Sequence, residues 1–403
     1  MKKSMIVAAM LAMVATGANA KSATDSATIA KNKPVFTVVK QNPITSIKDQ
    51  NRSGTCWAYS TLSYFESEIL KHTGKTYDLS EMFVANKTYM DRATMAVRMH
   101  GDVSFSEGGS AYDVLYALQH YGIVPEGAMP APGTLTGDSL ANFGEFFNVM
   151  TPYVEAVAKS NAKKISSAWK SGLQGIIDSY IGKTPEKFTY QGKQYTPQSF
   201  CQSLGLNLDD YVTITSYTHH PMWSKFAVEV QDNWRWPLSY NVPMDDLCKI
   251  IDNAINNGYT IAWGGDVTED GFTRKGLGIA YDVKKVRSMA GTDADRWFKL
   301  SKDEKKEKFD SLGVNAPEVT PTQAMRQEAF DNWETTDDHG MHIYGIAKDQ
   351  NGKEYYMVKN SWGEYGDYKG TWYMTKAFVA YKTMDFMVNK NAIPKDIRKK
   401  LGI

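Results

Sequence analysis

The chain has 403 residues, with 46 basic and 45 acidic residues and a formal net charge of +1. This near-neutral balance argues against a nucleic-acid-binding surface, although a local basic patch would not show in it. The length suffices for one large domain, or for a core with a subdomain.

The first twenty residues have the pattern of an export signal. Lys2-Lys3 precedes an apolar run over residues 5–14, and Ala18-Asn19-Ala20 supplies the small residues of a cleavage site. The apolar run is too short to span a membrane. We therefore expect a signal peptide at 1–20 and an exported protein, periplasmic or extracellular, with no membrane attachment after its removal.

Residues 21–35 are polar and rich in Ser, Thr, Ala and Lys, which predicts a flexible leader. The main domain is then expected at 36–403. Its first part, about 36–130, is expected to be a helical lobe that carries Cys56.

Cys56 is the most informative residue of this lobe. An amphipathic helix is predicted directly after it, because apolar residues recur at helical spacing and Gly74 marks a stop; these residues are Ala58, Leu62, Phe65 and Ile69. Cys56 thus lies at a helix N-terminus, where free N–H groups and the helix dipole favour the nucleophilic thiolate. A buried structural cysteine is the alternative.

Further elements follow from apolar spacing and turn residues. Helices are predicted between 140 and 182 from two stripes, which we expect to pack on the core rather than to form a partner surface: Phe143, Phe146, Phe147, Met150, then Ile165, Trp169, Leu173, Ile176, Tyr180. A short hairpin is expected at 187–196, a buried strand from Tyr259 to Trp263, and polar helices at 303–312 and 322–333.

No metal or cofactor is expected, because the Cys-x-x-Cys, His-x-x-His and Gly-rich phosphate-loop patterns are missing. His219 and His220 are adjacent, and in a strand they would diverge, so we expect a structural or rim role for them. Besides Cys56 the chain has Cys201 and Cys248, which form either one disulfide or two buried free thiols.

A hairpin near the C-terminus brings two polar residues together. Residues 338–347 and 354–359 predict paired strands, joined by a turn that contains Asn351-Gly352. Folding about this turn places positions 339 and 360 opposite each other. We therefore expect His339 to be a base whose orientation and tautomer are held by the amide oxygen of Asn360.

Three nearby residues have weaker claims to a role in this pair. His342 lies three residues beyond His339, on the opposite face of the strand, which argues against its acting as the base. Asp338 is the sequence neighbour of His339 and is expected to point elsewhere. Trp362 could cover the pair from water.

The motifs, taken in chain order, resemble the papain superfamily of cysteine peptidases. They are Gln50, Ser53-Gly54-Thr55-Cys56-Trp57, Asp338-His339-Gly340 and Asn360-Ser361-Trp362-Gly363, and the tract Ser106 to Ser110 resembles the superfamily's Gly-Gly motif. His339 lies much further beyond Cys56 than the about 130–150 residues of compact members. With Ser53 in place of a cysteine, this spacing resembles the bleomycin hydrolase and aminopeptidase C branch.

The resemblance implies a fold and a set of roles. The fold is α+β and papain-like with two lobes, one helical and one an antiparallel β-barrel-like lobe, with a large, mainly helical insertion around 131–255. It implies Cys56 as nucleophile, His339 as base, Asn360 as its orienting residue and Gln50 as an oxyanion donor. It places substrate against a wall formed by Trp57, Gly108, Gly109 and Trp362.

It further implies peptide substrates and, as in the family, a homohexamer whose C-terminal segments enter the clefts and favour aminopeptidase action. Residues 391–403 look short against that arm, although the Ile403 carboxylate could pair with a substrate's α-ammonium group. An oligopeptidase or endopeptidase with an open cleft is the alternative. A non-catalytic peptide-binding protein is a third reading, against which the intact Gln-Cys-His-Asn set speaks.

Overall fold

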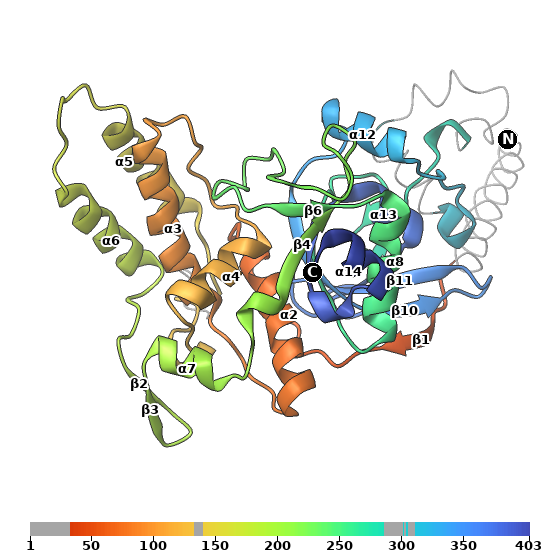
Figure 1. The fold of residues 1–403 in the computed structure, drawn as a ribbon, viewed down its shortest axis with the longest axis horizontal. Helices are drawn as coiled ribbons and strands as arrows, with labels where there is room; N and C mark the ends of the chain where they lie inside the picture. The colour runs from red at the N-terminus through yellow and green to blue at the C-terminus, as the bar shows by residue number, and fades with distance from the viewer. Residues whose placement is uncertain (1–32, 133–139, 286–300, 302–303, 305–310) are drawn as a thin grey trace, which may run out of the picture. The chain divides into compact units, whose positions relative to one another are not determined.

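The computed structural model describes residues 33–132, 140–285, 301, 304 and 311–403 (Figure 1). The chain divides into two compact units. The smaller takes its described residues from 1–37, 280–319 and 348–353, and it includes the short helical turn η3 (Gly313–Asn315). The larger, formed by 38–279, 320–347 and 354–403, contains the candidate site.

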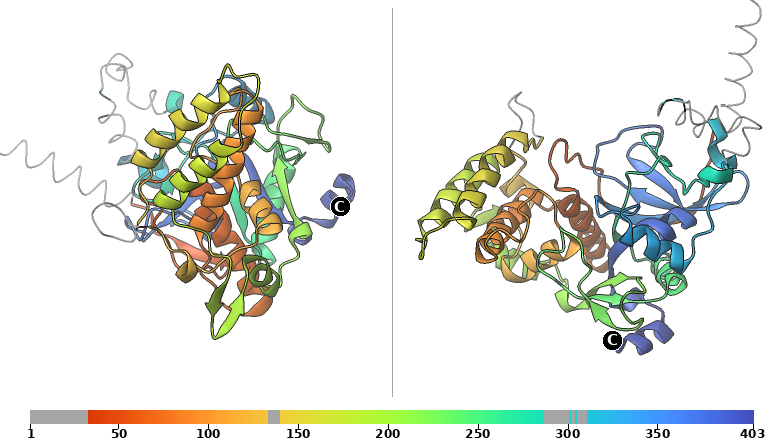
Figure 2. Two further views of the ribbon diagram at one scale, coloured as in Figure 1. Left: turned by 90° about the vertical axis from the view of Figure 1, so that its left-hand side faces the viewer. Right: turned by 90° about the horizontal axis from the view of Figure 1, so that it is seen from above.

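Most helices of the larger unit come from its first half. They are α2 (Cys56–Thr73), α3 (Glu81–Arg98), α4 (Ala111–His120), α5 (Gly144–Ala158), α6 (Ala168–Tyr180) and α7 (Pro197–Ser203), with the short turns η1 (Glu126–Ala128) and η2 (Leu208–Asp210). Helices α3, α5 and α6 lie side by side (Figure 2). Phe146 is fully buried between them and stacks on Tyr180, with ring centroids 5.2 Å apart. The expected packing of the α5 stripe on the core is therefore confirmed.

Helix α2 is confirmed in its bounds but not in its amphipathic character. It ends at Gly74, whose φ of +69° is the left-handed conformation that favours glycine. Every residue from Trp57 to Ile69 is buried, because α3 and α4 pack on this helix together with a strand of the sheet. Its polar side chains therefore need internal partners: Glu66 accepts from Thr45, and Glu68 accepts from Asn389.

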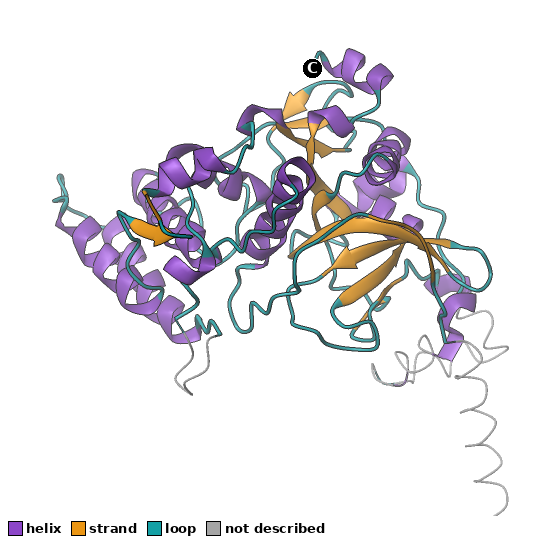
Figure 3. Ribbon diagram, turned by 90° about the horizontal axis from the view of Figure 1, so that it is seen from below, coloured by secondary structure: helices purple, strands orange, loops and turns teal. Residues whose placement is uncertain are grey.

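The second half of the unit is built around a sheet, whose strands are drawn in orange in Figure 3. Its described strands are β1 (Thr37–Gln41), β4 (Tyr211–Thr215), β5 (Lys225–Phe226), β6 (Ser239–Asn241), β7 (Ile261–Gly265), β8 (Phe272–Thr273), β9 (Leu277–Gly278), β10 (His339–Lys348), β11 (Glu354–Lys359), β12 (Thr371–Thr375) and β13 (Thr383–Asn389). Their order is β5-β6-β4-β13-β7-β10-β11-β12-β9-β8, with β1 beside β10. The pairs β4–β6 and β9–β12 are parallel, so the sheet is mixed rather than purely antiparallel.

Helices α8 (Met244–Asn256), α12 (Gln323–Asp331), α13 (Lys376–Lys382) and α14 (Lys395–Leu401) and the turn η4 (Lys390–Ala392) complete the unit. The expected helix at 322–333 and strand near Tyr259 are thus confirmed as α12 and β7. The expected hairpin at 187–196 is confirmed as β2 (Phe188–Tyr190) and β3 (Lys193–Tyr195). The α+β class is confirmed.

Other expectations have mixed outcomes. The stretch 131–255 contains α5 to α8, but its strands β4, β5 and β6 belong to the main sheet. All three cysteines are free thiols, so no disulfide joins Cys201 to Cys248. Residues 1–20, most of 21–35 and most of 303–312 lie outside the described residues. Within the described residues, no helix combines the length and hydropathy needed to cross a membrane.

The buried aromatic cluster of α5 gives a prediction for stability. Phe146→Ala should lower the free energy of unfolding by about 3–5 kcal/mol, because it removes a fully buried ring and leaves a cavity. Val149→Ala, on the same helix but 42% exposed, is the control and should change it by less than about 0.5 kcal/mol. Urea unfolding measures both, and equal effects would contradict this packing.

Candidate active site

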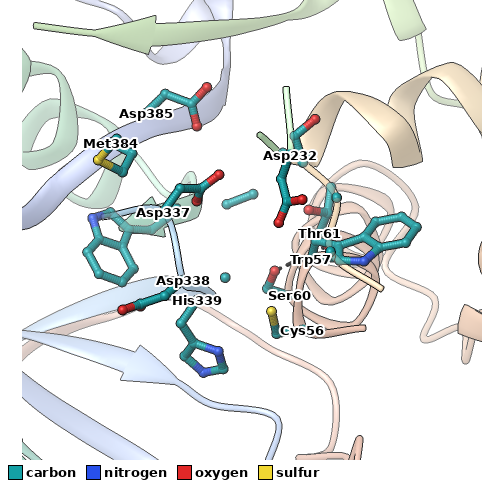
Figure 4. A pocket seen from close by; sticks show the side chains of 18 of the residues that line it. Cys56, Trp57, Ser60, Thr61, Asp232, Asp337, Asp338, His339, Met384 and Asp385 are labelled. Atoms are coloured by element: carbon teal, nitrogen blue, oxygen red, sulfur yellow. Dashed lines mark hydrogen bonds between the residues drawn. The ribbon is translucent and has the colours of Figure 1, made fainter. Parts of the chain in front are cut away.

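A cavity of about 300 Å³ lies between the helices and the sheet of the larger unit. Figure 4 shows Cys56, from the start of α2, and His339, from the start of β10, at one end of it. The other expected site residues that line it are Gln50, Trp57, Gly108, Gly109 and Trp362. Asn360 does not line it and lies behind His339.

Cys56 is the first residue of α2, and this helix start has no side-chain cap. Thr55 precedes the helix, but its hydroxyl bonds to the Ser53 hydroxyl at 2.6 Å and makes no capping bond to the helix backbone. The Ala58 N–H donates to the Thr55 carbonyl at 2.9 Å and the Trp57 N–H bonds the Cys56 sulfur, so the Cys56 N–H is the donor of the first turn left for a group at the cavity. Cys56 is partly exposed, whereas Cys201 is buried.

A glycine lets strand β10 reach this helix start. A Cβ atom on Gly340 would lie 2.7 Å from the Ser60 hydroxyl and 3.3 Å from the Cys56 carbonyl oxygen. The backbone of Gly340 also hydrogen-bonds the Cys56 sulfur. Because His339 is the neighbour of Gly340, this contact brings Cys56 and His339 to the same end of the cavity (Figure 4).

The expected pairing of His339 with Asn360 is confirmed. The Nε2 atom of His339 lies 2.8 Å from Oδ1 of Asn360, and both residues are buried. This oxygen accepts a hydrogen bond from the Nε2–H group, so Nδ1 is the nitrogen that carries the free lone pair. The Trp362 ring lies over the imidazole, with centroids 4.9 Å apart, and shields the pair as expected.

His342 lies elsewhere, as expected from its position along the strand. It is fully buried, and its Nδ1 lies 2.9 Å from the hydroxyl of Ser63. Burial, followed by the charge of Lys359, holds its pKa well below the usual range. It does not line the cavity of Cys56.

Burial pushes the Cys56–His339 pair toward its neutral form. It raises the pKa of the Cys56 thiol to about 12, although hydrogen bonds from the backbone of Gly340 and Trp57 act in the opposite direction. It lowers the pKa of His339 to about 4, against the effect of the Asn360 bond. The helix N-terminus therefore does not by itself make Cys56 a resting thiolate. At neutral pH Cys56 is a thiol and His339 is a neutral imidazole.

Gln50 is held by a residue that the sequence analysis did not assign. Ser361 donates from its hydroxyl to Oε1 of Gln50 at 2.6 Å, and its carbonyl accepts the Gln50 N–H at 2.8 Å. One hydrogen of the Gln50 amide nitrogen goes to the Ser53 carbonyl oxygen at 2.7 Å. The amide therefore has a fixed orientation, with its second hydrogen left for a ligand.

Gly108 and Gly109 form one wall of the cavity, at positions that have no room for a side chain. A Cβ atom on Gly109 would lie 2.8 Å from the Trp57 ring, and one on Gly108 would lie 1.8 Å from an oxygen of Asp232. The buried Arg92 ties this wall together, since it donates to the Gly108 carbonyl at 2.6 Å and to Asp232 at 3.0 Å. Trp57 is only 2% exposed, so its ring supports the wall from behind.

Carboxylates surround the other end of the cavity. Asp232, Asp337 and Asp385 point into the same space (Figure 4), and Asp338 also lines it. Burial, then the charges of Asp232, Asp385 and Asp338, raises the pKa of Asp337 well above its usual range. Burial raises the pKa of Asp385 to about 6. Within the described part of the chain, neither Asp337 nor Asp385 forms an ion pair with a lysine or arginine.

The C-terminal tail contributes nothing to this cavity. Among the described residues that line the cavity, Asp385 is the last in the chain. Helix α14 instead buries Ile397 and Leu401, and the preceding turn accepts a bond from Asn253 at the Ala392 carbonyl. The Ile403 carboxylate, considered above as a partner for substrate, is therefore not among the cavity groups.

The expected divergence of His219 and His220 is wrong. The two residues lie in a turn after β4 rather than in a strand. Both Nε2 atoms point to one carboxylate, that of Glu229, each at 2.9 Å from a different oxygen. A turn has no alternation of side chains between two faces, which is why the expectation failed.

Comparisons with known proteins identify the relatives of this chain. A family model described as "Peptidase C1-like family" matches residues 2–333 and 310–402. Aminopeptidase C of Lactobacillus helveticus is 23% identical over 410 residues, covering 90% of this chain and 85% of that protein. Bleomycin hydrolase of Homo sapiens is 20% identical over 419 residues, covering 92% and 86%. The crystal structure of PepW from Lactobacillus rhamnosis HN001 superposes with a TM-score of 0.67 at 18% identity, covering 97% of this chain and 92% of that chain, which shows a shared fold.

The pKa shifts of Cys56 and His339 predict how alkylation depends on pH. The rate of Cys56 alkylation by iodoacetamide should be flat near neutrality and fall with a midpoint near pH 4, where His339 gains a second proton and no longer serves as base. In His339→Ala the rate should instead rise with pH through the alkaline range. Mass spectrometry of the modified peptide measures both. His342→Gln is the control, and a loss of the acid limb in it would contradict the assignment.

Proposed function

Because this chain is a cysteine peptidase of the Peptidase C1-like family, we propose that it is an aminopeptidase, which removes residues from the free N-terminus of peptides through Cys56, His339 and Asn360. The aminopeptidase and bleomycin hydrolase relatives support this proposal. The observation that carries it is the group of carboxylates that shares a cavity with Cys56.

In the proposed first step, the thiol of Cys56 gives its proton to Nδ1 of His339 and the sulfur attacks the carbonyl carbon of the scissile bond. The pair then carries opposite charges, which attract each other most strongly when they are close together. Asn360 holds Nε2 of His339, so the ring keeps its orientation as its charge changes. Trp362 keeps water from that bond.

The negative charge that develops on the substrate oxygen needs donors. We assign them to the free hydrogen of the Gln50 amide and to the Cys56 N–H at the uncapped start of α2. The His339 imidazolium then protonates the leaving amine, which departs and leaves an acyl group on Cys56. A water molecule, losing a proton to His339, attacks this thioester and restores the thiol.

The free α-ammonium group of the substrate has counter-ions among the carboxylates that line the same cavity as Cys56. Asp337 and Asp385 are partly buried carboxylates without a cationic partner among the described residues, and desolvating such groups is costly until a positive charge arrives. A peptide with an acetylated N-terminus cannot supply it. This role falls to internal side chains because the C-terminal residues do not line the cavity.

An endopeptidase with an open cleft is the alternative, and it makes a different prediction about acetylated substrates. A non-catalytic peptide-binding protein is disfavoured by the intact site. We also propose that the protein is exported, on the strength of Lys2-Lys3, the apolar run and Ala18-Asn19-Ala20. Assembly as a homohexamer is a prediction that rests on family resemblance.

The Gln50 assignment gives a kinetic prediction. Gln50→Ala should lower kcat by roughly 10²–10³-fold and change KM much less, because the bond matures only in the transition state. Ser361→Ala should lower kcat by a smaller factor, and Ser361→Thr, which keeps the hydroxyl, should restore it. Steady-state kinetics measures all three. A rise in KM alone would mean that Gln50 binds substrate instead.

The carboxylates give the prediction that tests the proposed function. Asp337→Asn should raise KM for leucyl-aminomethylcoumarin by about 10–100-fold, the usual value of a bond to a charged group. The N-acetylated substrate should be cleaved poorly by the unaltered enzyme and no worse by this variant. Release of fluorescent coumarin measures both.

Two controls complete this experiment. Asp270→Asn changes an exposed acid outside the cavity and should leave KM unchanged. Cys56→Ala should abolish all turnover while the protein stays folded. If the unaltered enzyme cleaves acetylated and free substrates equally well, the aminopeptidase proposal fails and the endopeptidase reading holds.

A further inference from the structure

His219, His220 and Glu229 form a cluster outside the catalytic pair. Their ligand atoms, the two imidazole nitrogens and a carboxylate oxygen, all lie within 4.8 Å of one another. The two histidines come from the turn after β4, and Glu229 comes from the segment after β5. Proteins bind zinc and similar metals with imidazole nitrogens and carboxylate oxygens that meet at one point from separate segments, as these three side chains do.

Both imidazole rings are held in place by packing. His220 stacks on Phe226, with centroids 4.2 Å apart and planes at 21°. His219 stacks on Phe330 of α12, with centroids 5.6 Å apart and planes at 19°. Rings fixed in this way lose little side-chain entropy when they bind an ion, so the site is largely preformed.

A supporting contact fixes the other nitrogen of His219. Nδ1 lies 3.3 Å from the side-chain oxygen of Gln327, to which its N–H donates when Nε2 binds a metal, and the amide nitrogen of Gln327 donates to Asp331 at 2.9 Å. A metal-binding histidine commonly has its second nitrogen held by such a polar group, which leaves the first as ligand.

We propose that His219, His220 and Glu229 bind one divalent transition-metal ion of the zinc class. Two imidazoles and one carboxylate suit zinc, whereas magnesium and calcium prefer oxygen ligands alone. Three protein ligands leave a coordination position for water. The sequence patterns had predicted no metal, because adjacent histidines match none of the usual spacings.

The position of the site ties it to the catalytic cavity. Glu229 lines a groove together with Val230 and Asp232, and both of these also line the cavity of Cys56. Val228, on the other side of Glu229, lines that cavity as well. An ion on Glu229 would therefore fasten the segment that forms one wall of the cavity to the histidine turn.

The test is titration of the full-length protein with Zn²⁺ by calorimetry. Cys56→Ser serves as the background, because the catalytic thiol could itself take the ion. One Zn²⁺ should bind per chain and raise Tm, and Mg²⁺ should not replace it. His219→Gln, His220→Gln and Glu229→Gln in this background should each weaken Zn²⁺ binding at least about tenfold, since each removes one ligand.

The control His100→Asn changes an exposed histidine far along the chain from the cluster and should bind Zn²⁺ as the background does. X-ray absorption should show Zn–N distances of about 2.0–2.1 Å. Circular dichroism checks that each variant is folded, and the loss of the Zn²⁺-dependent rise in Tm is a second readout. Absence of Zn²⁺ binding to the background, or binding unchanged in all three ligand variants, overturns the proposal and leaves Glu229 as an acceptor of two imidazole hydrogen bonds.

Discussion

The contact between strand β10 and the first turn of α2 is the constraint on which the site depends. It requires a residue without a side chain at Gly340, because a Cβ atom there would meet Ser60 and the Cys56 carbonyl. His339 and Gly340 pair with Gly265 and Gly264 on β7, so glycines occupy both strands at this point. The approach places the start of α2, with the Cys56 N–H, near the residue that carries the imidazole.

The segment 360–362 then supports several parts of the site from one place. Asn360 holds the imidazole of His339, Ser361 holds the amide of Gln50, and Trp362 covers the imidazole ring. The proposed base and the proposed oxyanion donor are therefore positioned by consecutive residues. A shift of this segment would disturb both functions together, so mutations here are expected to be non-additive with mutations of the groups they support.

Burial disfavours charged side chains in the cavity. It favours the neutral forms of Cys56 and His339, and it raises the pKa of Asp337 and Asp385 as well. In the proposed mechanism, Cys56 and His339 become charged only during the reaction, as a thiolate and an imidazolium close together. For Asp337 and Asp385, a cationic group that enters the cavity would complete the charge balance. In the proposed function, the same cavity thus serves both bond cleavage and substrate recognition.

The sequence by itself determined the local features. Apolar spacing and Gly74 predicted α2 and its end, and turn chemistry predicted the hairpin that joins His339 to Asn360, because these depend on neighbours along the chain. The tertiary structure alone decided the full burial of α2, the bond of Arg92 to Asp232, and the convergence of His219 and His220 on Glu229. Each of these depends on contacts between segments whose separation in sequence carries no periodic or turn signal, and on burial, which sets pKa values that motif spacing cannot report.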